Sequence, residues 1–542
     1  MKLITEASAE KLRGGFYTPE PIADFLLRWG INGSETFDIL EPSCGDGVFL
    51  EQIREKHHNY RSITAIEIDE IEAALARNIL LPNTQVIVND FHTYCNNTHQ
   101  RFDLVIGNPP YIRYQFFETK QQIEAEYIFI KAGLKYSRLT NAWVSFVVGS
   151  SLLLKEEGGK IAFVLPAEIL QVSFAKQLRN FLAHFYNKIN IISFEKLVFP
   201  NIQQEVVLLL CEKDQTTEHK IEHIELKDIV DLQTLDISRL KSPQKRIDFN
   251  SSKWTFYFLK QEEINFLENI AKDRKIPSLG RFANVEVGIT TGSNDFFTVP
   301  LKTVDDYGLS DYAKPMVGRS VQVNSVIFTK EDWKQNQHSK AKAHLLVFPS
   351  RQNLNQNNGA MAYIANGESN QINKGYKCGI RDDWFVVPSL KISDALFIRR
   401  NNLYPRLIIN QAKAYTTDTM HRVFVKLGTN LEAFTASYYN SLSLAFTEVC
   451  GRSHGGGVLE LMPNEAERIL LPYKTSNAEL LPTIDEMIRN KTDISEVLKF
   501  TNQIILKEHF GLTDEEINLS NNIWKKLSGR RLNRGKKFKE TF

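Results

Sequence analysis

The sequence lacks several features that would place it in other protein classes. Its five cysteines are scattered without any C-x-x-C pair, which argues against a zinc site and a disulfide framework and fits a reducing cytosol. No apolar run approaches the roughly 18 residues that a membrane span needs. The first residues also have no apolar core of signal-peptide length. We therefore expect a cytoplasmic protein that has neither a membrane partner nor a metal.

A strong net charge and internal repeats are also missing. The net charge is only +2, so total charge gives no sign of a nucleic-acid partner. Basic residues gather instead in residues 525–539, a tail that either meets phosphate or is a solvated terminus. No repeat of fixed period is present. A chain of 542 residues is too long for one ordinary core, so two or three domains are expected.

Three strand-like apolar segments each end in an acidic residue. These residues are Glu41, Glu67 and Asp90, and in a parallel sheet the ends of such strands meet at one edge. The glycines of the turn after Glu41 flank Asp46 and do not follow the spacing G-x-G-x-x-G. Such a turn suits a cationic ligand with an amino acid end better than a pyrophosphate.

A fourth apolar segment, residues 104–106, delivers Asn108-Pro109-Pro110-Tyr111 to the same edge. This quartet offers one amide, backbone carbonyls on prolines that have no N–H, and one aromatic face. It suits a planar group carrying an NH2, held flat and hydrogen-bonded. Alone, it leaves adenine in DNA, a glutamine amide and guanine in RNA all open as substrates.

The order of the other segments predicts the rest of the fold. Strand and helix patterns alternate up to about residue 211, which predicts a mostly parallel sheet covered on both faces. Two late strands, near 189–195 and 205–210, are joined too tightly for a crossover helix and should be antiparallel. Residues 213–250 resemble a polar connector, 352–373 a long exposed loop, and 494–527 a helical segment.

Taken in order, these motifs resemble the γ class of DNA adenine-N6 methyltransferases over roughly residues 12–211. The resemblance implies an α/β fold with a doubly wound, mostly parallel, seven-stranded methyltransferase (Rossmann-like) sheet in a catalytic domain, residues 1–245. It also implies an α+β target-recognition domain, residues 246–490, and a helical C-terminal segment with a basic tail, residues 491–542.

The resemblance further implies that S-adenosylmethionine lies across the first three strand ends. Glu67 would hold the ribose, Asp90 would bond the cofactor adenine amine, and Phe91 would lie against its ring. The implied cofactor-binding residues are Tyr17, Thr18, Pro19, Glu41, Pro42, Ser43, Cys44, Gly45, Asp46, Gly47, Glu67, Ile68, Asp90, Phe91 and Asn108.

On the substrate side, the implied catalytic residues are Asn108, Pro109, Pro110 and Tyr111. Asn108 and the Pro109 carbonyl would bind N6 of an adenine flipped out of double-stranded DNA, and Tyr111 and Phe199 would stack on the base. Candidate DNA contacts are Arg452, His454, Arg530, Arg531, Arg534 and Lys536. The expected partner, besides DNA, is a cognate restriction endonuclease encoded separately, and the chain itself is expected to be a monomer.

Other interpretations remain open at this point. The same quartet occurs in enzymes that methylate a protein glutamine amide or an RNA base amine, but here the large extra region follows the strands. An inactive DNA-binding relative is a third possibility. Phe199 is alternatively an ordinary core residue, and Arg452 a structural ion pair. No P-D…(D/E)-x-K nuclease signature is evident, so we expect methylation only.

Overall fold

The structure is a computed structural model, and the chain divides into two compact units, residues 1–261 and 262–542. It describes residues 17–31, 36–56, 58–112, 116–137, 140–172, 174–196, 198–199, 205–236, 238, 240, 243–249, 253–354, 358–454 and 457–540, with side chains up to residue 533. The predicted domain boundary at 245/246 falls within a strand of the first unit.

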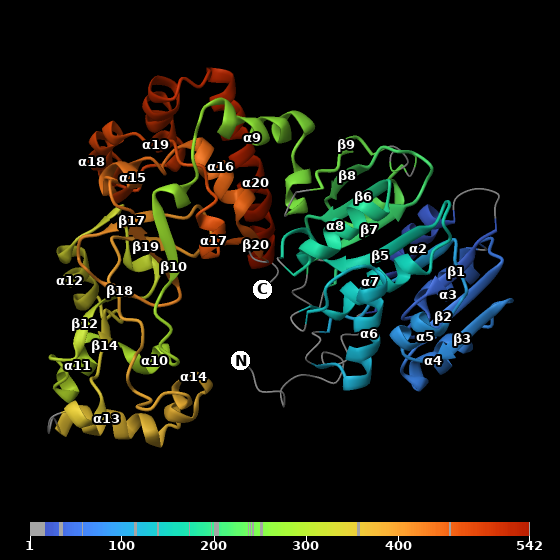
Figure 1. Ribbon diagram of the computed structural model, residues 1–542, viewed down its shortest axis with the longest axis horizontal. Helices are drawn as coiled ribbons and strands as arrows, with labels where there is room; N and C mark the ends of the chain where they lie inside the picture. Colours follow the sequence, from blue (N-terminus) through green and yellow to red (C-terminus); the bar gives the residue numbers. More distant parts are fainter. Residues whose placement is uncertain are drawn as a thin grey trace. The chain divides into compact units, whose positions relative to one another are not determined.

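The described part of unit 1 is built on a nine-stranded sheet in the order β3-β2-β1-β4-β5-β7-β6-β8-β9 (Figure 1). The strands are β1 (Asp38–Glu41), β2 (Ser62–Glu67), β3 (Thr84–Val88), β4 (Leu104–Gly107), β5 (Lys160–Pro166), β6 (Lys188–Phe194), β7 (Val206–Glu212), β8 (Lys220–Leu226) and β9 (Lys245–Arg246). From β3 to β5 all neighbours are parallel, whereas β7 is antiparallel to both β5 and β6. The predicted antiparallel pair is confirmed.

Helices cover both faces of this sheet. They are α2 (Glu20–Gly30), α3 (Val48–Lys56), α4 (Glu70–Arg77), α5 (Phe91–Asn97), α6 (Thr119–Lys131), α7 (Ala142–Leu152) and α8 (Lys176–Phe185). Ile39 and Leu104 share one core cluster with α2 and α3, while Leu40 and Val105 are buried outside that cluster. Because successive strand residues point to opposite faces, both faces are buried. The doubly wound α/β fold is confirmed, with two more strands than expected.

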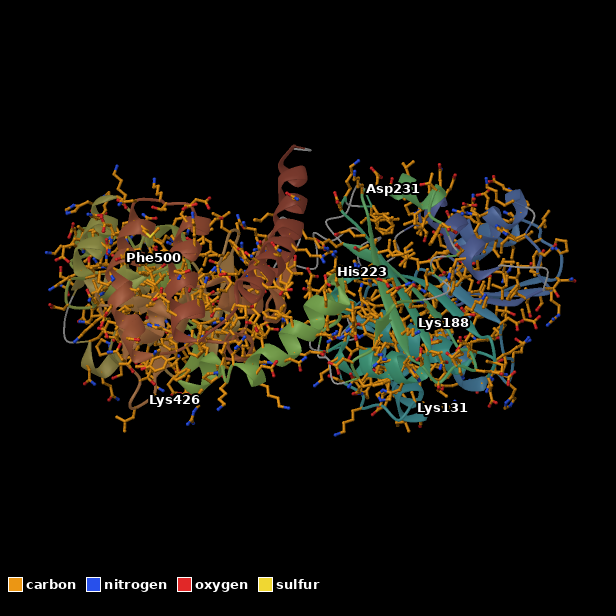
Figure 2. All side chains as sticks on the ribbon, turned by 90° about the horizontal axis from the view of Figure 1, so that it is seen from above. Lys131, Lys188, His223, Asp231, Lys426 and Phe500 are labelled. Carbon is orange, nitrogen blue, oxygen red and sulfur yellow. The ribbon has the colours of Figure 1, made fainter. Side chains whose placement is uncertain are left out.

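The interpretation of residues 213–250 as a polar connector is wrong, because this segment contains β8 and β9. Strand β8 is parallel to β6, and His223 Nε2 lies 3.0 Å from Ser193 Oγ across the pair. Figure 2 labels Lys188 on β6 and His223 on β8. Of the β8 residues only Ile221 is buried. A half-exposed strand near the edge of a sheet has a polar sequence. Strand β8 therefore lacks the apolar run by which β1 to β7 were predicted.

Unit 2 combines three smaller sheets, with β10-β19-β15-β17-β13, β11-β14-β12-β18 and β16-β21-β20 as the strand orders in its described residues. The strands are β10 (Ala283–Val287), β11 (Thr298–Val299), β12 (Ala313–Val317), β13 (Ile327–Phe328), β14 (His344–Leu346), β15 (Ala395–Ile398), β16 (Arg400–Asn401), β17 (Leu407–Asn410), β18 (Tyr415–Thr416), β19 (Met420–Val425), β20 (Arg452–His454) and β21 (Val458–Glu460).

The helices from the unit boundary onward are mostly short. They are α9 (Gln261–Asp273), α10 (Asn294–Phe297), α11 (Leu301–Tyr307), α12 (Lys330–His338), α13 (Asn358–Ser369), α14 (Tyr376–Gly379), α15 (Leu431–Ala436), α16 (Ser441–Cys450), α17 (Pro463–Ala466), α18 (Leu481–Arg489), α19 (Ile494–Thr501) and α20 (Asp514–Glu540). The α+β character expected of this part of the chain is present. None of the helices in the described ranges is both long and apolar enough to cross a membrane.

The prediction of a long exposed loop at residues 352–373 is wrong, because most of it forms α13. Ala360, Tyr363, Ile364 and Gly367 lie at helical spacing and are buried on one face. A Cβ on Gly367 would come within 2.5 Å of the rings of Phe296 and Trp384, so the helix packs closely there. The asparagines and glycines of this segment predicted a loop, although it has an apolar face.

The C-terminal segment is helical, as predicted, but it is interrupted. A π-helical stretch (Asn502–His509) follows α19, and Gly511 then takes a left-handed φ of 64° before α20 begins. Helix α20 packs along α16, and residues 491–542 belong to the second compact unit.

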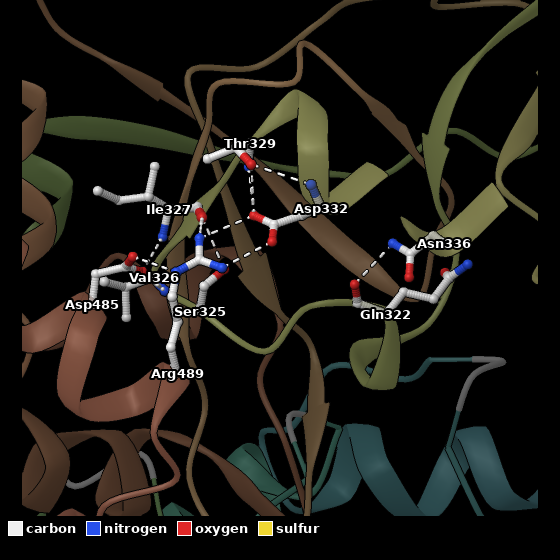
Figure 3. Close-up of polar contacts among 9 residues, drawn as sticks. All are labelled: Gln322, Ser325, Val326, Ile327, Thr329, Asp332, Asn336, Asp485 and Arg489. Atoms are coloured by element: carbon white, nitrogen blue, oxygen red, sulfur yellow. Dashed lines mark hydrogen bonds and ion pairs between the residues drawn. The ribbon is translucent and has the colours of Figure 1, made fainter. Parts of the chain in front are cut away.

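An ion-pair network joins α12, β13 and α18 within unit 2 (Figure 3). Arg489 contacts Asp332 at 2.8 Å and Asp485 at 2.6 Å, and its guanidinium donates to the Ile327 carbonyl. The other Asp485 oxygen accepts the backbone N–H groups of Val326 and Ile327. Bidentate arginine contacts of this kind fix orientation as well as distance, so the network holds β13 against both helices.

Candidate active site

A cavity of about 430 Å³ opens at the carboxyl ends of β1 to β4. The predicted site residues that line it are Tyr17, Thr18, Glu41, Pro42, Ser43, Cys44, Gly45, Asp46, Glu67, Ile68, Asp90, Phe91, Asn108 and Pro110. Pro19, Gly47, Pro109, Tyr111 and Phe199 are not among its lining residues. The motifs that are far apart in the sequence therefore meet at one edge of the sheet.

The turn between β1 and α3 is shaped by two glycines in the left-handed region. Gly45 has a φ of 53° and Gly47 a φ of 98°, and a Cβ on Gly47 would lie 2.6 Å from the Ile79 side chain. Only glycine fits this close approach without strain. The Ser43 hydroxyl donates to the Asn108 carbonyl at 3.3 Å, which links this turn to the end of β4.

Glu41 is a buried acid on the cavity wall. The residue is 2 % exposed, and its Oε2 has no hydrogen-bond partner within the described part of the chain. Burial, followed by the nearby charges of Glu67 and Asp46, raises the pKa of Glu41 well above its usual 4.5. A buried carboxylate without a partner is costly, so the cavity fits a ligand with a cationic or hydrogen-donating group at this point.

Glu67 ends β2 with its carboxylate held by the backbone. One oxygen accepts the N–H groups of Ile68 and Asp69 at 2.8 and 2.9 Å, and the other accepts the Gly45 N–H at 2.9 Å. A carboxylate oxygen has more than one lone pair, so the oxygen facing Gly45 still has acceptor capacity for a ligand hydroxyl. This arrangement fits the predicted ribose contact, which stays a prediction.

Asp90 lies two residues after β3 and caps α5, where it accepts the Thr93 N–H at 3.1 Å. His92 Nδ1 lies 3.3 Å from one carboxylate oxygen, and the Gln121 amide donates to the other at 3.1 Å. Burial tends to raise the pKa of Asp90, but the close approach of His92 and the hydrogen bonds from Thr93 and Gln121 outweigh it and lower the pKa below 3.8. Asp90 is therefore fixed in place as an anionic acceptor.

Several lining residues were missed by the sequence reasoning. Phe146 stacks on Phe91 with ring centroids 4.8 Å apart, while His92 and Gln121 bind Asp90. His92 directly follows Asp90 and Phe91, which the sequence predicted to bind the cofactor, so its position could have indicated that it lines the cavity. Gln121 and Phe146 lie on α6 and α7, and nothing in their local sequence marks them as part of the cavity.

At the end of β4 the Asn108 side chain reaches the cavity and contacts Tyr111. The Tyr111 hydroxyl lies 2.9 Å from Asn108 Oδ1 and 3.1 Å from the Val164 carbonyl oxygen. Its proton is shared between these two acceptors. The Tyr111 ring packs against the core cluster of α2 and α3, and burial raises the pKa of its hydroxyl. Tyr111 thus holds Asn108 here, and its stacking on a base stays a prediction.

Phe199 is 5 % exposed and belongs to that same core cluster. In this structure it has the environment of a core residue and not that of a cavity wall. Its role against a target base stays a prediction.

The predicted DNA contacts in unit 2 lie in different environments. Arg452 pairs with Glu465 at 3.0 Å, and His454 with Glu460 at 2.8 Å. Arg531 as a phosphate contact is contradicted, because its side chain is 2 % exposed and pairs with the buried Glu448. Arg530 stays a prediction. The side chains of Arg534 and Lys536 lie outside the described residues.

Comparisons with known proteins give two family matches for this chain. A family model described as Eco57I restriction-modification methylase matches residues 47–199, and one described as Type II methyltransferase M.Eco57I, C-terminal domain, matches residues 251–506. The chain is 25% identical over 471 residues to Type II methyltransferase M.AccI of Acinetobacter calcoaceticus, with 84% of each chain covered. It is 28% identical over 245 residues to M.HincII of Haemophilus influenzae, covering 45% of this chain and 43% of that relative.

A likeness to a solved structure concerns the fold. The structure titled "cryoEM structure DrdV-DNA complex" matches with a TM-score of 0.50 and 12% identity, over 93% of this chain and 58% of that chain. The two family models together span most of the sequence, including the residues that line the cavity from Val48 onward. Over both of these regions the chain therefore matches the restriction–modification methylases of the Eco57I family.

Proposed function

We propose that this chain transfers a methyl group from S-adenosylmethionine to N6 of an adenine in double-stranded DNA. The observation that carries the proposal is that Asn108, at the end of β4, lines the same cavity as Glu41, Glu67 and Asp90. An amide oxygen that suits an exocyclic amine therefore lies beside carboxylates that suit a nucleoside carrying an amino acid.

In this proposal the acids of the cavity hold the cofactor, whose sulfonium supplies the methyl group. Glu41 has an oxygen without a partner and accepts the ammonium group of the methionine part. Glu67 accepts the ribose hydroxyls, and Asp90 accepts the adenine amine. Asp90 would then exchange its Gln121 amide contact for the cofactor amine, because both are N–H donors to the same oxygen.

The substrate amine is bound by acceptors at the end of β4. The lone pair of adenine N6 is delocalised into the ring, so the amine is a poor nucleophile. Acceptance of its two hydrogens by Asn108 Oδ1 and the Pro109 carbonyl favours a pyramidal nitrogen, whose lone pair then points away from the ring. An amide oxygen carries two lone pairs, and the Tyr111 hydroxyl donates to Asn108 Oδ1. Positioning and electrostatics provide most of the rate gain.

The substrate class is proposed from the second unit and from the relatives. A base within a duplex cannot enter such a cavity and must be flipped out at a cost of a few kcal/mol. M.AccI and M.HincII are named Type II methyltransferases, and the DrdV structure is titled as a complex with DNA. By analogy, the modification would protect DNA from a separately encoded restriction endonuclease, and the chain would act as a monomer.

The test is to incubate the purified chain with methyl-labelled S-adenosylmethionine and, separately, DNA, RNA and protein from a methylation-deficient bacterium. Label is expected in DNA alone, as N6-methyladenine by mass spectrometry. Asn108→Ala should lower the rate by about 100-fold or more, because it removes one acceptor aimed at the reacting amine. The control Asn78→Ala changes an exposed asparagine at the end of α4 and should leave the rate unchanged.

Other outcomes separate the alternatives. Label in RNA or protein would replace DNA as the substrate class, and no label despite cofactor binding would indicate an inactive relative. Native sequencing of DNA from cells that express the chain would give the target sequence. Light scattering tests the proposed monomer.

A further inference from the structure

A short turn of unit 2 exposes two large apolar side chains close together. Tyr376 is 82 % exposed and Ile380 is 71 % exposed, at the start of α14 and just after its end. Lys374 and Lys377 are exposed beside them. We call residues 374–381 the α14 turn. Figure 1 shows α14 at the end of unit 2 that also carries α13.

The backbone of the α14 turn is fixed by contacts with the segment around residues 290–292. Cys378, between the two exposed side chains, is fully buried, and its sulfur lies 2.8 Å from where a Cβ on Gly292 would be. The Arg381 guanidinium donates to the carbonyls of Thr290 and Thr291 at 3.2 and 2.8 Å. The apolar side chains are therefore presented by a fixed backbone, which lowers the entropy that binding would cost.

The charge around the α14 turn favours a polyanion. Lys374 and Lys377 are exposed, and Arg381 adds a third positive charge. Asp382 is the exposed acid that follows, whereas Asp383 accepts the Arg351 N–H. Lysine is depleted in the cores of protein–protein interfaces, but it is a standard phosphate ligand. An exposed aromatic ring among lysines suits a surface on which a deoxyribose packs while phosphates pair with the lysines.

We propose that the α14 turn is a DNA-contact surface, with Tyr376 and Ile380 packed on sugars and base edges and Lys374 and Lys377 on phosphates. This inference rests on the proposed function, because it assumes that DNA is the substrate. It assigns a contact role to a segment outside the residues predicted from the sequence to touch DNA.

The test measures binding to duplex fragments of methylation-deficient bacterial DNA at several salt concentrations. Tyr376→Ala should weaken binding about 10-fold, and Tyr376→Phe should retain most of it, since the ring makes the contact. The double variant Lys374→Ala, Lys377→Ala should lower the slope of log affinity against log salt by about 2. The control Leu427→Ala removes another exposed apolar side chain, in a turn after β19, and should change neither quantity.

A second measurement does not depend on how well the alanine variants fold. Tyr376 is replaced by the photo-crosslinking residue p-benzoylphenylalanine in the full chain, and DNA adducts are expected on illumination. Wild-type affinity and slope in the folded variants, or no adduct from position 376, would overturn the inference. If wild type itself neither binds nor methylates DNA in this assay, then it is the proposed function that has failed.

Discussion

At the scale of single residues, Glu41 links cofactor binding to pH. Its raised pKa means that the ligand-free protein holds a proton there above the ordinary value of 4.5. An ammonium group on the carboxylate would favour the ionised form, so binding should release a proton and affinity should rise with pH through this window. The folding stability of the ligand-free protein should instead fall as pH rises above 4.5, because the acid then ionises more readily in the unfolded chain than in its buried position.

Isothermal titration calorimetry in two buffers of different ionisation enthalpy measures this proton release. Wild type should release a proton on binding S-adenosylmethionine, whereas Glu41→Gln should bind more weakly and release none. The control is Glu55→Gln, an exposed glutamate on α3. Equal proton release by wild type and Glu41→Gln would contradict the assignment.

The Tyr111 hydroxyl gives a second residue-scale prediction. Tyr111→Phe keeps the ring but removes the hydrogen-bond donor to Asn108 Oδ1 and Val164. We expect a loss of about 1 kcal/mol in unfolding free energy and a lower kcat, because Asn108 is then less well oriented. Urea unfolding and methylation kinetics measure the two effects. The control Tyr60→Phe removes an exposed hydroxyl bonded to Pro82 and should leave kcat unchanged, and an unaffected kcat in Tyr111→Phe would count against the orienting role.

At the scale of elements, the buried pair of Arg531 and Glu448 joins α20 to α16. The Arg531 guanidinium also donates to the carbonyls of Asn402, Leu403 and Gly457, next to β16 and β21. Burial raises the pKa of Glu448 although the arginine opposes it. Arg531 therefore holds a helix against two strand ends and is committed to the interior of its unit.

Removal of one partner of such a pair leaves a buried charge alone. Arg531→Met should lower the unfolding free energy by about 3–5 kcal/mol, and adding Glu448→Leu should recover part of this loss. Urea unfolding followed by tryptophan fluorescence, to which the buried Trp524 of α20 contributes, provides the measurement. Lys302→Met, which breaks the exposed Lys302–Asp306 pair, should cost less than about 1 kcal/mol. A similar small cost for Arg531→Met would rule out a structural role of that size.

The elements that the sequence predicted well are those with a strong local pattern. Glu41 and Glu67 end largely buried strands and Asn108 follows a fully buried one, so these residues and Asp90 could be placed at one edge from the sequence alone. Strand β7, inserted between β5 and β6, depends on pairing between distant segments. Gln121 reaches Asp90 from a helix 31 positions away. Arg531 illustrates a further limit of prediction from sequence. The sequence does not show whether an arginine contacts a phosphate or a buried glutamate.

At the scale of the whole molecule, the residues that line the cavity all belong to the first compact unit. Each unit also has core clusters of its own. We expect a fragment of residues 1–261 to bind S-adenosylmethionine with an affinity within about threefold of the full chain. Titration calorimetry checks this, with Glu67→Ala in the same fragment as the negative control. Loss of cofactor binding from a folded fragment would show that the second unit contributes to the cavity.

The buried cysteines allow local opening of the protein to be measured by thiol alkylation. Cys44, Cys95, Cys211 and Cys378 are buried, and burial raises the pKa of each thiol. Alkylating reagents attack the thiolate, so these sulfurs react slowly in the folded protein and faster when the segment around them opens. Cys44 lies in the cavity turn and Cys378 beneath the α14 turn. The alkylation rate of Cys44 therefore reports local opening of the turn between β1 and α3. The alkylation rate of Cys378 reports local opening of the α14 turn, the surface proposed to contact DNA.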